Sequence, residues 1–165
     1  MTVLAAGVVV LGGCGSDDEA TGGNADNPAS ASPSAETANA VLTTGDTDLG
    51  TVVVDAKGMT VYVFDKDTPG SGVSTCTGGC LEAWPPVVAD SDSPVAEGVD
   101  GDVGAITRDD GTKQVTLDGY PLYYWQGDAN AGDATGQGVQ GVWWVVAPDG
   151  TKITETAAPA PGDGY

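Results

Sequence analysis

The chain has 165 residues, of which 24 are Asp or Glu and 5 are Lys or Arg, so its formal net charge is −19 at pH 7. A surface this acidic would repel a polyphosphate backbone, which excludes nucleic acid as a partner. The chain contains no histidine, which excludes the commonest general base, the usual nitrogen ligand of zinc, copper and haem, and any Ser-His-Asp relay.

Residues 1–13 resemble a lipoprotein signal peptide. A short apolar run ends in Leu11-Gly12-Gly13-Cys14, where the glycines supply the small side chains that a signal peptidase requires. The resemblance to a bacterial lipobox implies that Cys14 becomes the first mature residue and carries a diacylglycerol, with the membrane as its partner. Signal peptides begin with basic residues and none precedes Lys57, so we expect the translation start to lie upstream.

Residues 14–41 have the composition of a lipid-anchored, disordered linker. They are rich in Gly, Ser, Ala and Asp, so ordering them would cost chain entropy without burying apolar surface. Residues 155–165 are rich in Ala, Pro and Gly and predict a flexible tail. We therefore expect the β domain to occupy residues 42–154.

The first half of this domain begins with a predicted β-hairpin. Leu49 to Val54 and Met59 to Asp65 are rich in β-branched and aromatic residues, and Asp55-Ala56-Lys57-Gly58 between them has the composition of a turn. Leu81 to Trp84 is compatible with one helical turn, which Pro85-Pro86 would end.

The second half repeats this organisation after a polar connection at residues 90–102. Val103 to Thr107 and Gln114 to Leu117 flank a turn and predict a second hairpin. The remaining strand-like runs are Leu122 to Gln126, Val142 to Ala147 and Lys152 to Thr154. Helical periodicity is nowhere sustained, so the sequence predicts an all-β fold, a small sandwich or barrel-like sheet pair.

An aromatic–acid motif occurs twice in the domain. Tyr62-Val63-Phe64-Asp65-Lys66-Asp67 returns as Tyr123-Tyr124-Trp125-Gln126-Gly127-Asp128, with the same offset of 61 residues at both ends, since 123 − 62 equals 128 − 67. This indicates two related repeats, at about residues 49–90 and 103–154. Because neither aromatic run has a polar face, we interpret the rings as core or inter-repeat packing, with an exposed platform for sugars or peptides as the alternative.

Cys76 and Cys80 predict a disulfide bond. Thiols oxidise in an exported chain, and this spacing in a glycine-containing loop allows the two Cα atoms to come within bridging distance. Closing so small a ring would stabilise the fold by about 2 kcal/mol. The alternative is a redox-active pair, although the spacing is not that of Cys-x-x-Cys sites. The pairing assumes that Cys14 carries the lipid.

Three oxygen-bearing side chains, Asp128, Asn130 and Asp133, lie in one loop and superficially resemble a calcium site. The match is poor because Gly132 and Val139 stand where an EF-hand needs oxygen ligands. We interpret the three residues as formers of Asx-turns, with a weak cation site formed together with Asp65 or Asp67 as the alternative. No resident metal or cofactor is predicted.

Two further patterns have a plain structural interpretation. Asp109-Asp110 is interpreted as a solvated turn, because adjacent turn residues face different ways and do not form an acid/base pair. The glycines of residues 136–141 are spaced like a phosphate loop, but a strand follows where a helix is required, so we interpret them as a flexible connection.

In their order along the chain, these features resemble the bacterial secreted-repeat lipoproteins that are defined by a Tyr-x-aromatic-x-x-Asp motif. The features are Tyr62, Phe64 and Asp67; Cys76 and Cys80; Trp84-Pro85-Pro86; Arg108-Asp109-Asp110-Gly111 before Gln114-Val115-Thr116; Pro121-Leu122-Tyr123 with Trp125 and Asp128; and Gly136-Gln137-Gly138 before Trp143. Asn130-Ala131 departs from the Pro-Gly that is common in the family. The resemblance implies an exported, usually lipid-anchored protein of unassigned molecular function, and it supplies no catalytic residue.

The sequence therefore favours a non-enzymatic envelope lipoprotein, located outside the cytoplasm and anchored to the membrane through Cys14. Its β module would have a binding or structural role toward an envelope glycan or protein. The alternative is an extracytoplasmic redox or electron-transfer partner that uses Cys76 and Cys80, and a carboxylate-dependent glycan hydrolase is a third hypothesis.

Overall fold

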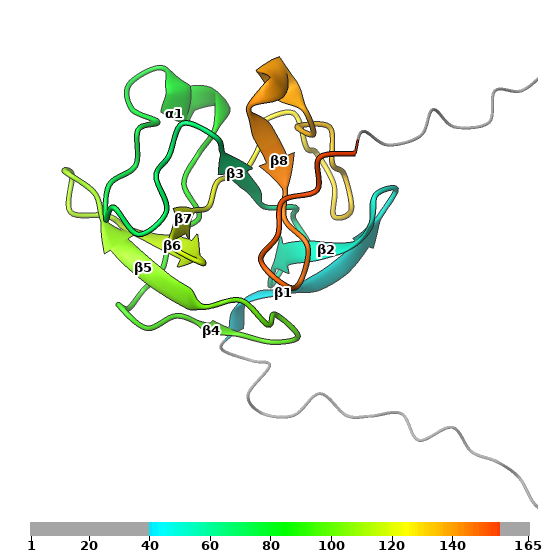
Figure 1. Ribbon diagram of the computed structural model, residues 1–165, viewed down its shortest axis with the longest axis horizontal. Helices are drawn as coiled ribbons and strands as arrows, with labels where there is room; N and C mark the ends of the chain where they lie inside the picture. Colours follow the sequence, from blue (N-terminus) through cyan, green and yellow to red (C-terminus); the bar gives the residue numbers. More distant parts are fainter. Residues whose placement is uncertain (1–39, 156–165) are drawn as a thin grey trace, which may run out of the picture. The chain divides into compact units, whose positions relative to one another are not determined.

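The computed structural model describes residues 40–155, and the regular structure in this range is almost entirely β (Figure 1). The strands are β1 (Ala40–Thr47), β2 (Gly50–Asp55), β3 (Tyr62–Phe64), β4 (Val95–Ala96), β5 (Val103–Thr107), β6 (Lys113–Leu117), β7 (Tyr120–Pro121) and β8 (Trp143–Val145). The helical elements within the described range are α1 (Cys80–Ala83) and the 3-10 helix η2 (Val139–Gly141). The predicted all-β class is confirmed.

The signal peptide, Cys14, the linker up to residue 39 and the tail from residue 156 lie outside the described residues. Within the described part of the chain, neither helical element has the length and apolar character needed to cross a bilayer.

The strands form three small sheets, with the orders β2-β1-β4, β3-β8 and β5-β6-β7. Two antiparallel hairpins, β1-β2 and β5-β6, begin the two repeats. The predicted hairpin of Leu49 to Val54 with Met59 to Asp65 is wrong as a ladder, because β2 pairs with β1 and β3 with β8, and one bridge from Val54 to Thr60 is formed between the two segments. β6 turns into β7 through Asp118-Gly119, where both residues have positive φ (48° and 79°), the conformation of the tight hairpin turn that Asp-Gly favours. β3 pairs with β8, so the first motif lies against the C-terminal strand (Figure 1).

Two clusters of buried side chains hold the sheets together. One is aliphatic and consists of Leu42, Val53, Val61, Val63, Val87, Ala89, Val115, Leu117, Leu122 and Val146. The other is largely aromatic and consists of Val52, Val54, Tyr62, Phe64, Cys76, Trp84, Tyr123, Trp143 and Val145. Because side chains alternate along a strand, neighbouring residues of β2 enter different clusters, Val53 the first and Val52 the second.

Besides the short β7, the structure contains two strands that the sequence did not predict. β1 includes Ala40 and Val41, which the composition had assigned to the linker, and continues through the polar residues 43–47, whose side chains are only partly covered. β4 lies in the predicted polar connection and exists through parallel pairing with β1. Both are products of pairing between segments rather than of local hydrophobicity.

The predicted strand from Leu122 to Gln126 is wrong as a continuous ladder. Only Tyr123 forms β-bridges there, one of them to Pro86. The segment opposite contains Pro85-Pro86, and proline has no N–H to donate, so it cannot pair regularly. The helical turn predicted at Leu81 to Trp84 is confirmed by α1, and the second hairpin by β5 and β6.

Candidate functional site

The two copies of the motif are joined crosswise at the centre of the domain. Tyr62 and Tyr123 face each other in an antiparallel bridge, with hydrogen bonds of 2.9 Å from Tyr62 N to Tyr123 O and 3.0 Å from Tyr123 N to Tyr62 O. The Tyr62 hydroxyl donates to Asp128 Oδ2 and the Tyr123 hydroxyl to Asp67 Oδ2, each at 2.6 Å. Each repeat's aspartate therefore holds the other repeat's tyrosine.

The second oxygen of each aspartate is also used in the same way in both repeats. Asp67 Oδ1 accepts from Thr75 N (2.7 Å) and Thr75 Oγ1 (2.6 Å). Asp128 Oδ1 accepts from Thr135 N (2.9 Å) and Thr135 Oγ1 (2.7 Å). Both carboxylates are buried with all their oxygens hydrogen-bonded, as buried charges require.

Burial raises the pKa of Tyr62 and of Tyr123 above the usual range, and the hydrogen bond from each hydroxyl to an aspartate oxygen raises it further. The two phenols are therefore neutral hydrogen-bond donors at any physiological pH. A neutral phenol with its proton committed to a carboxylate is a structural group, and it is not available as an acid or a nucleophile.

Four aromatic rings form a column that repeats the twofold pattern. Phe64 stacks on Trp143 (ring centroids 4.1 Å apart), Trp143 on Trp84 (3.8 Å), and Trp84 contacts Trp125 (4.3 Å). The motif tyrosines meet the two central indoles edge-on, Tyr62 at Trp84 (5.4 Å) and Tyr123 at Trp143 (5.2 Å). The rings thus pack in the core, as the packing interpretation predicted, and Trp125 is half-buried.

Trp143 is the residue of this column that sequence reasoning missed as a counterpart of Trp84. Val145 pairs with Tyr62 and Pro86 bridges to Tyr123, which places the two tryptophans in equivalent positions. The only signal in the sequence is that an indole follows each motif, because the loops between them differ in length.

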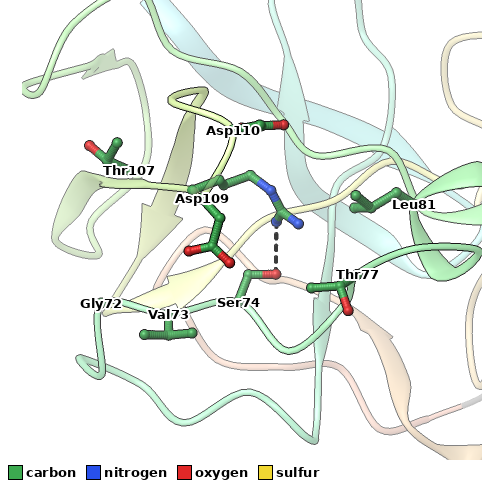
Figure 2. A pocket seen from close by; sticks show the side chains of 9 residues that line it. Gly72, Val73, Ser74, Thr77, Leu81, Thr107, Asp109 and Asp110 are labelled. Atoms are coloured by element: carbon green, nitrogen blue, oxygen red, sulfur yellow. Dashed lines mark hydrogen bonds between the residues drawn. The ribbon is translucent and has the colours of Figure 1, made fainter.

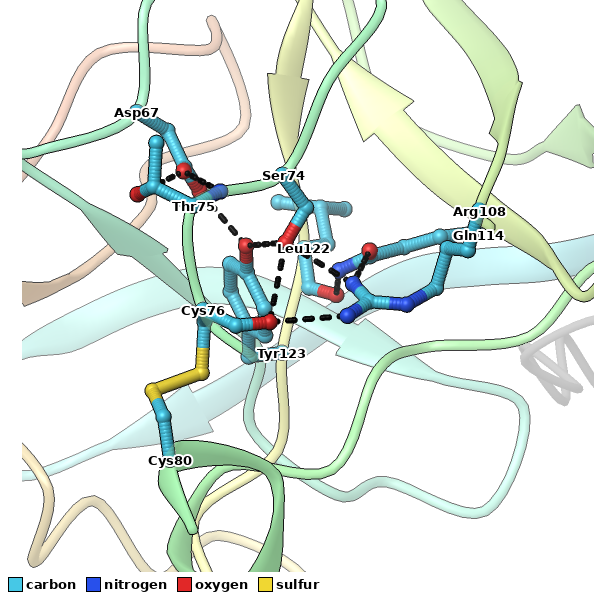
Figure 3. The surroundings of a disulfide bond; sticks show 9 residues. All are labelled: Asp67, Ser74, Thr75, Cys76, Cys80, Arg108, Gln114, Leu122 and Tyr123. Carbon is cyan, nitrogen blue, oxygen red and sulfur yellow. Dashed lines mark hydrogen bonds between the residues drawn. A yellow bond between two sulfur atoms is a disulfide. The ribbon is translucent and has the colours of Figure 1, made fainter. Parts of the chain in front are cut away.

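Cys76 and Cys80 form a disulfide bond with a Cα–Cα distance of 5.4 Å, which confirms the predicted pairing (Figure 3). Cys76 is buried, with 1% of its surface exposed, whereas Cys80 is half-buried at the first residue of α1. Cys80 also lines a cavity of about 420 Å³, together with Phe64, Lys66, Thr75, Gly79, Ala83, Trp84, Gln140 and Trp143.

Arg108 connects the disulfide loop to the crossed motif. Its Nη1 donates to Ser74 Oγ (2.8 Å) and to Gln114 Oε1, and its Nη2 donates to Cys76 O (2.7 Å) (Figure 3). Ser74 Oγ lies 2.6 Å from the Tyr123 hydroxyl, and buried Gln114 donates through Nε2 to Leu122 O (2.8 Å). Sequence reasoning did not foresee this network, because its members lie on three separate segments.

The Arg108 side chain lines a cavity of about 230 Å³ beside this network. The other lining residues are Gly72, Val73, Ser74, Thr77, Leu81, Thr107, Asp109 and Asp110 (Figure 2). Thr112 N donates to Asp110 Oδ1 (2.9 Å) and lowers the pKa of that carboxyl, which agrees with the turn interpretation of this acidic pair.

The loop that resembled a calcium site is held by its own carboxylate. Asp133 Oδ2 accepts from Ala129 N (3.0 Å) and Asn130 N (2.8 Å), and these backbone bonds lower the pKa of Asp133. Asp128 is committed to Tyr62 and Thr135. Among the described residues, no group of three or more Cys, Asp or Glu side chains is arranged to hold a metal ion.

The fold and the crossed motif define a β module of two interlocked repeats. The model of a family described as a secreted repeat of unknown function matches the chain twice, at residues 43–88 and 104–147, and the chain belongs to this family. Neither the curated proteins nor the solved structures include a match. Membership in a secreted family assigns the β module to the outside of the cytoplasm.

Proposed function

We propose that the protein is a lipid-anchored binding module of the cell envelope, without a catalytic role, in which the repeated motif is the scaffold. The observation that carries this proposal is the crossed pairing of the motif residues. Each tyrosine hydroxyl and each aspartate oxygen of the motif is engaged inside the core, so the motif offers no group to a substrate. The surface loops remain as the place for recognition.

The disulfide supports lipid anchoring through Cys14. The chain has three cysteines, and Cys76 and Cys80 are bonded to each other. Cys14 is thus the one cysteine not used by this pairing, and it follows the small residues that a lipobox requires.

The anchoring is tested by expressing the gene in its native host and partitioning the cells with a cloud-point detergent. We expect the protein in the detergent phase and the Cys14→Ala variant in the aqueous phase. Ser16→Ala, a neighbouring change that leaves the thiol in place, serves as the matched variant and is expected to behave like wild type. Wild-type protein in the aqueous phase would contradict the anchor.

The binding role is tested by a thermal-shift screen against envelope glycans and calcium. A ligand that binds only the folded form must raise the melting temperature by an amount set by its concentration relative to Kd. Hydrolysis of a glycan in the same screen would contradict the non-enzymatic assignment, and a screen without any shift would count against glycan or calcium binding.

A second candidate function, thiol–disulfide exchange, is favoured by the position of Cys80. An incoming thiolate reaching the cavity beside Lys66 would attack Cys80 Sγ and form a mixed disulfide, with Cys76 leaving as the thiolate. Equilibration with glutathione buffers followed by thiol trapping measures the reduction potential. A value above about −300 mV supports this candidate, and a lower value identifies the bond as structural.

A further inference from the structure

Matching the equivalent positions of the two repeats shows which residues both repeats share and which residues occur in one repeat only. Val61 N donates to Val53 O, and Leu122 N donates to Val115 O in the matching place, so the residue preceding each acceptor is equivalent. The buried Gln114 therefore occupies the position of Val52. In the same way Ser74, next to Thr75, corresponds to Ala134, next to Thr135. The second repeat's hairpin and the first repeat's loop thus meet in a polar network without a counterpart.

Arg108, the only arginine of the chain, is the centre of this network and keeps part of its donor capacity. A guanidinium has five N–H donors, and the three bonds from Arg108 go to uncharged acceptors on Ser74, Gln114 and Cys76. No carboxylate of residues 40–155 lies within ion-pairing distance of it, although acids outnumber bases greatly. Two N–H groups of this half-buried cation thus have no acceptor among residues 40–155 and are left for a ligand.

The cavity at Arg108 brings both charge signs and an apolar wall together. Asp109 and Asp110 line it on the turn that follows the arginine, and Val73 and Leu81 supply apolar surface (Figure 2). A purely anionic ligand would be opposed by the two aspartates and the net charge, and a purely cationic one by Arg108. A molecule with both charges a few ångströms apart satisfies both partners.

We propose that this cavity binds a small zwitterion of the amino-acid type, with its carboxylate on Arg108, its ammonium group at Asp109, and an apolar side chain against Val73 and Leu81. The cavity volume of about 230 Å³ lies below the range of drug-sized sites, about 300–1,000 Å³, and suits a ligand of this size. The proposal deepens the binding-module function and rests on it.

The experiment compares three molecules that differ in one charged group each. Leucine carries both groups, 4-methylpentanoate lacks the ammonium, and 3-methylbutan-1-amine lacks the carboxylate. Calorimetric titration of the full chain is expected to show binding of leucine. Binding of 3-methylbutan-1-amine should be at least about tenfold weaker, because the charged hydrogen bond to Arg108 is lost. Binding of 4-methylpentanoate should be about two- to fivefold weaker, because only the ion pair with the exposed Asp109 is lost. Equal binding of either analogue to that of leucine would overturn the zwitterion assignment, and no binding of leucine would overturn the site.

Three variants locate the site. Asp109→Asn is expected to weaken leucine binding about two- to fivefold, the range that exposed ion pairs give. Arg108→Gln is expected to abolish leucine binding. If that variant does not fold, the Asp109→Asn variant still tests whether leucine binds in this cavity. Asp149→Asn is the matched change, since Asp149 caps an equally exposed turn through Thr151 away from the cavity, and it is expected to bind like wild type. Unchanged affinity in Asp109→Asn would overturn the assignment of the ammonium group.

Detergent partitioning reports the membrane anchor separately from these titrations. If the protein partitions into the detergent phase but does not bind leucine, the zwitterion site alone is refuted. If it stays in the aqueous phase and binds leucine, the membrane-anchored function alone is refuted.

Discussion

In the first repeat the threonine that caps the motif aspartate is followed by Cys76, and in the second repeat its equivalent is followed by Gly136. The first loop is closed by a disulfide and linked to Arg108, whereas in the second loop Gly136 N donates to the Tyr62 hydroxyl (3.2 Å). The crossed tyrosine–aspartate bonds are nevertheless the same in both halves. What the halves share builds the fold, and what they do not share identifies where recognition can differ.

The largest expected effect is the loss of either central indole. Trp84→Ala and Trp143→Ala each remove a ring that is at most 3% exposed and that stacks on the other. Each is expected to lower the free energy of unfolding by about 3–5 kcal/mol, measured by denaturant titration. Val73→Ala, at a position that is 62% exposed, is the matched small change with little effect. If only one of the two substitutions lowered the free energy of unfolding, the two tryptophans would not be equivalent members of the aromatic column.

The next prediction concerns the two glycines of the capping loops. A Cβ at Gly136 would lie 2.9 Å from ring atoms of Tyr62 and Trp84, whereas a Cβ at Gly79 would meet nothing within 4 Å. Neither glycine has positive φ, so space alone decides. Gly136→Ala is expected to cost about 1–3 kcal/mol by overpacking, and Gly79→Ala less than about 0.5 kcal/mol. Equal melting temperatures of the two variants would contradict the packing at the second loop.

A double-mutant cycle sharpens the crossed pairing itself. Tyr62→Phe leaves Asp128 without one donor and is expected to cost about 1–2 kcal/mol. Combined with Asp128→Asn, its effect should be non-additive by at least about 0.5 kcal/mol, because the two side chains share a bond. Combined with Asp67→Asn, in the same repeat, the effects should add.

If Tyr62→Phe were non-additive with Asp67→Asn and additive with Asp128→Asn, the hydrogen bond would be made within one repeat and the crossed pairing would be wrong. The same cycle on Tyr123 and Asp67 provides the symmetrical measurement, and we expect coupling of similar size there because that hydrogen bond is also 2.6 Å long.

The sequence was sufficient to predict the duplication, the all-β class and the disulfide, because each rests on a local pattern. The aromatic–acid motif occurs twice in the sequence. The second hairpin has apolar runs on both sides of a turn, and the two cysteines are close together in the chain. β1 was hidden by the polar residues 43–47, whose pairing with β2 is decided by backbone hydrogen bonds rather than by apolar side chains.

The crossed tyrosine–aspartate hydrogen bonds could not be predicted from the sequence, for a physical reason. Tyr62 and Asp67 are close in sequence and invite pairing within the repeat, but the bond is made only when the two motif segments meet. The equivalent residues of the two repeats are also not separated by a constant number of residues. The separation falls by one from each of the following pairs to the next: Val53 and Val115, Tyr62 and Tyr123, Thr75 and Thr135, and Trp84 and Trp143. A search with a fixed period therefore finds the motif and loses its partners.

The last prediction concerns the stability of the wild-type fold in alkali. Folding raises the pKa of Tyr62 and Tyr123 above the unfolded value of about 10, mainly through burial. Such a shift contributes stability that is fully present below pH 10 and is lost as the pH rises from there toward the folded pKa, because the unfolded state then binds fewer protons. The melting temperature should fall above about pH 10, with tyrosinate absorbance rising together with unfolding. Tyr62→Phe is expected to have a lower stability at neutral pH and a shallower alkaline decline, and titration of all tyrosines in the folded protein near pH 10 would show that the crossed phenols are not buried as described.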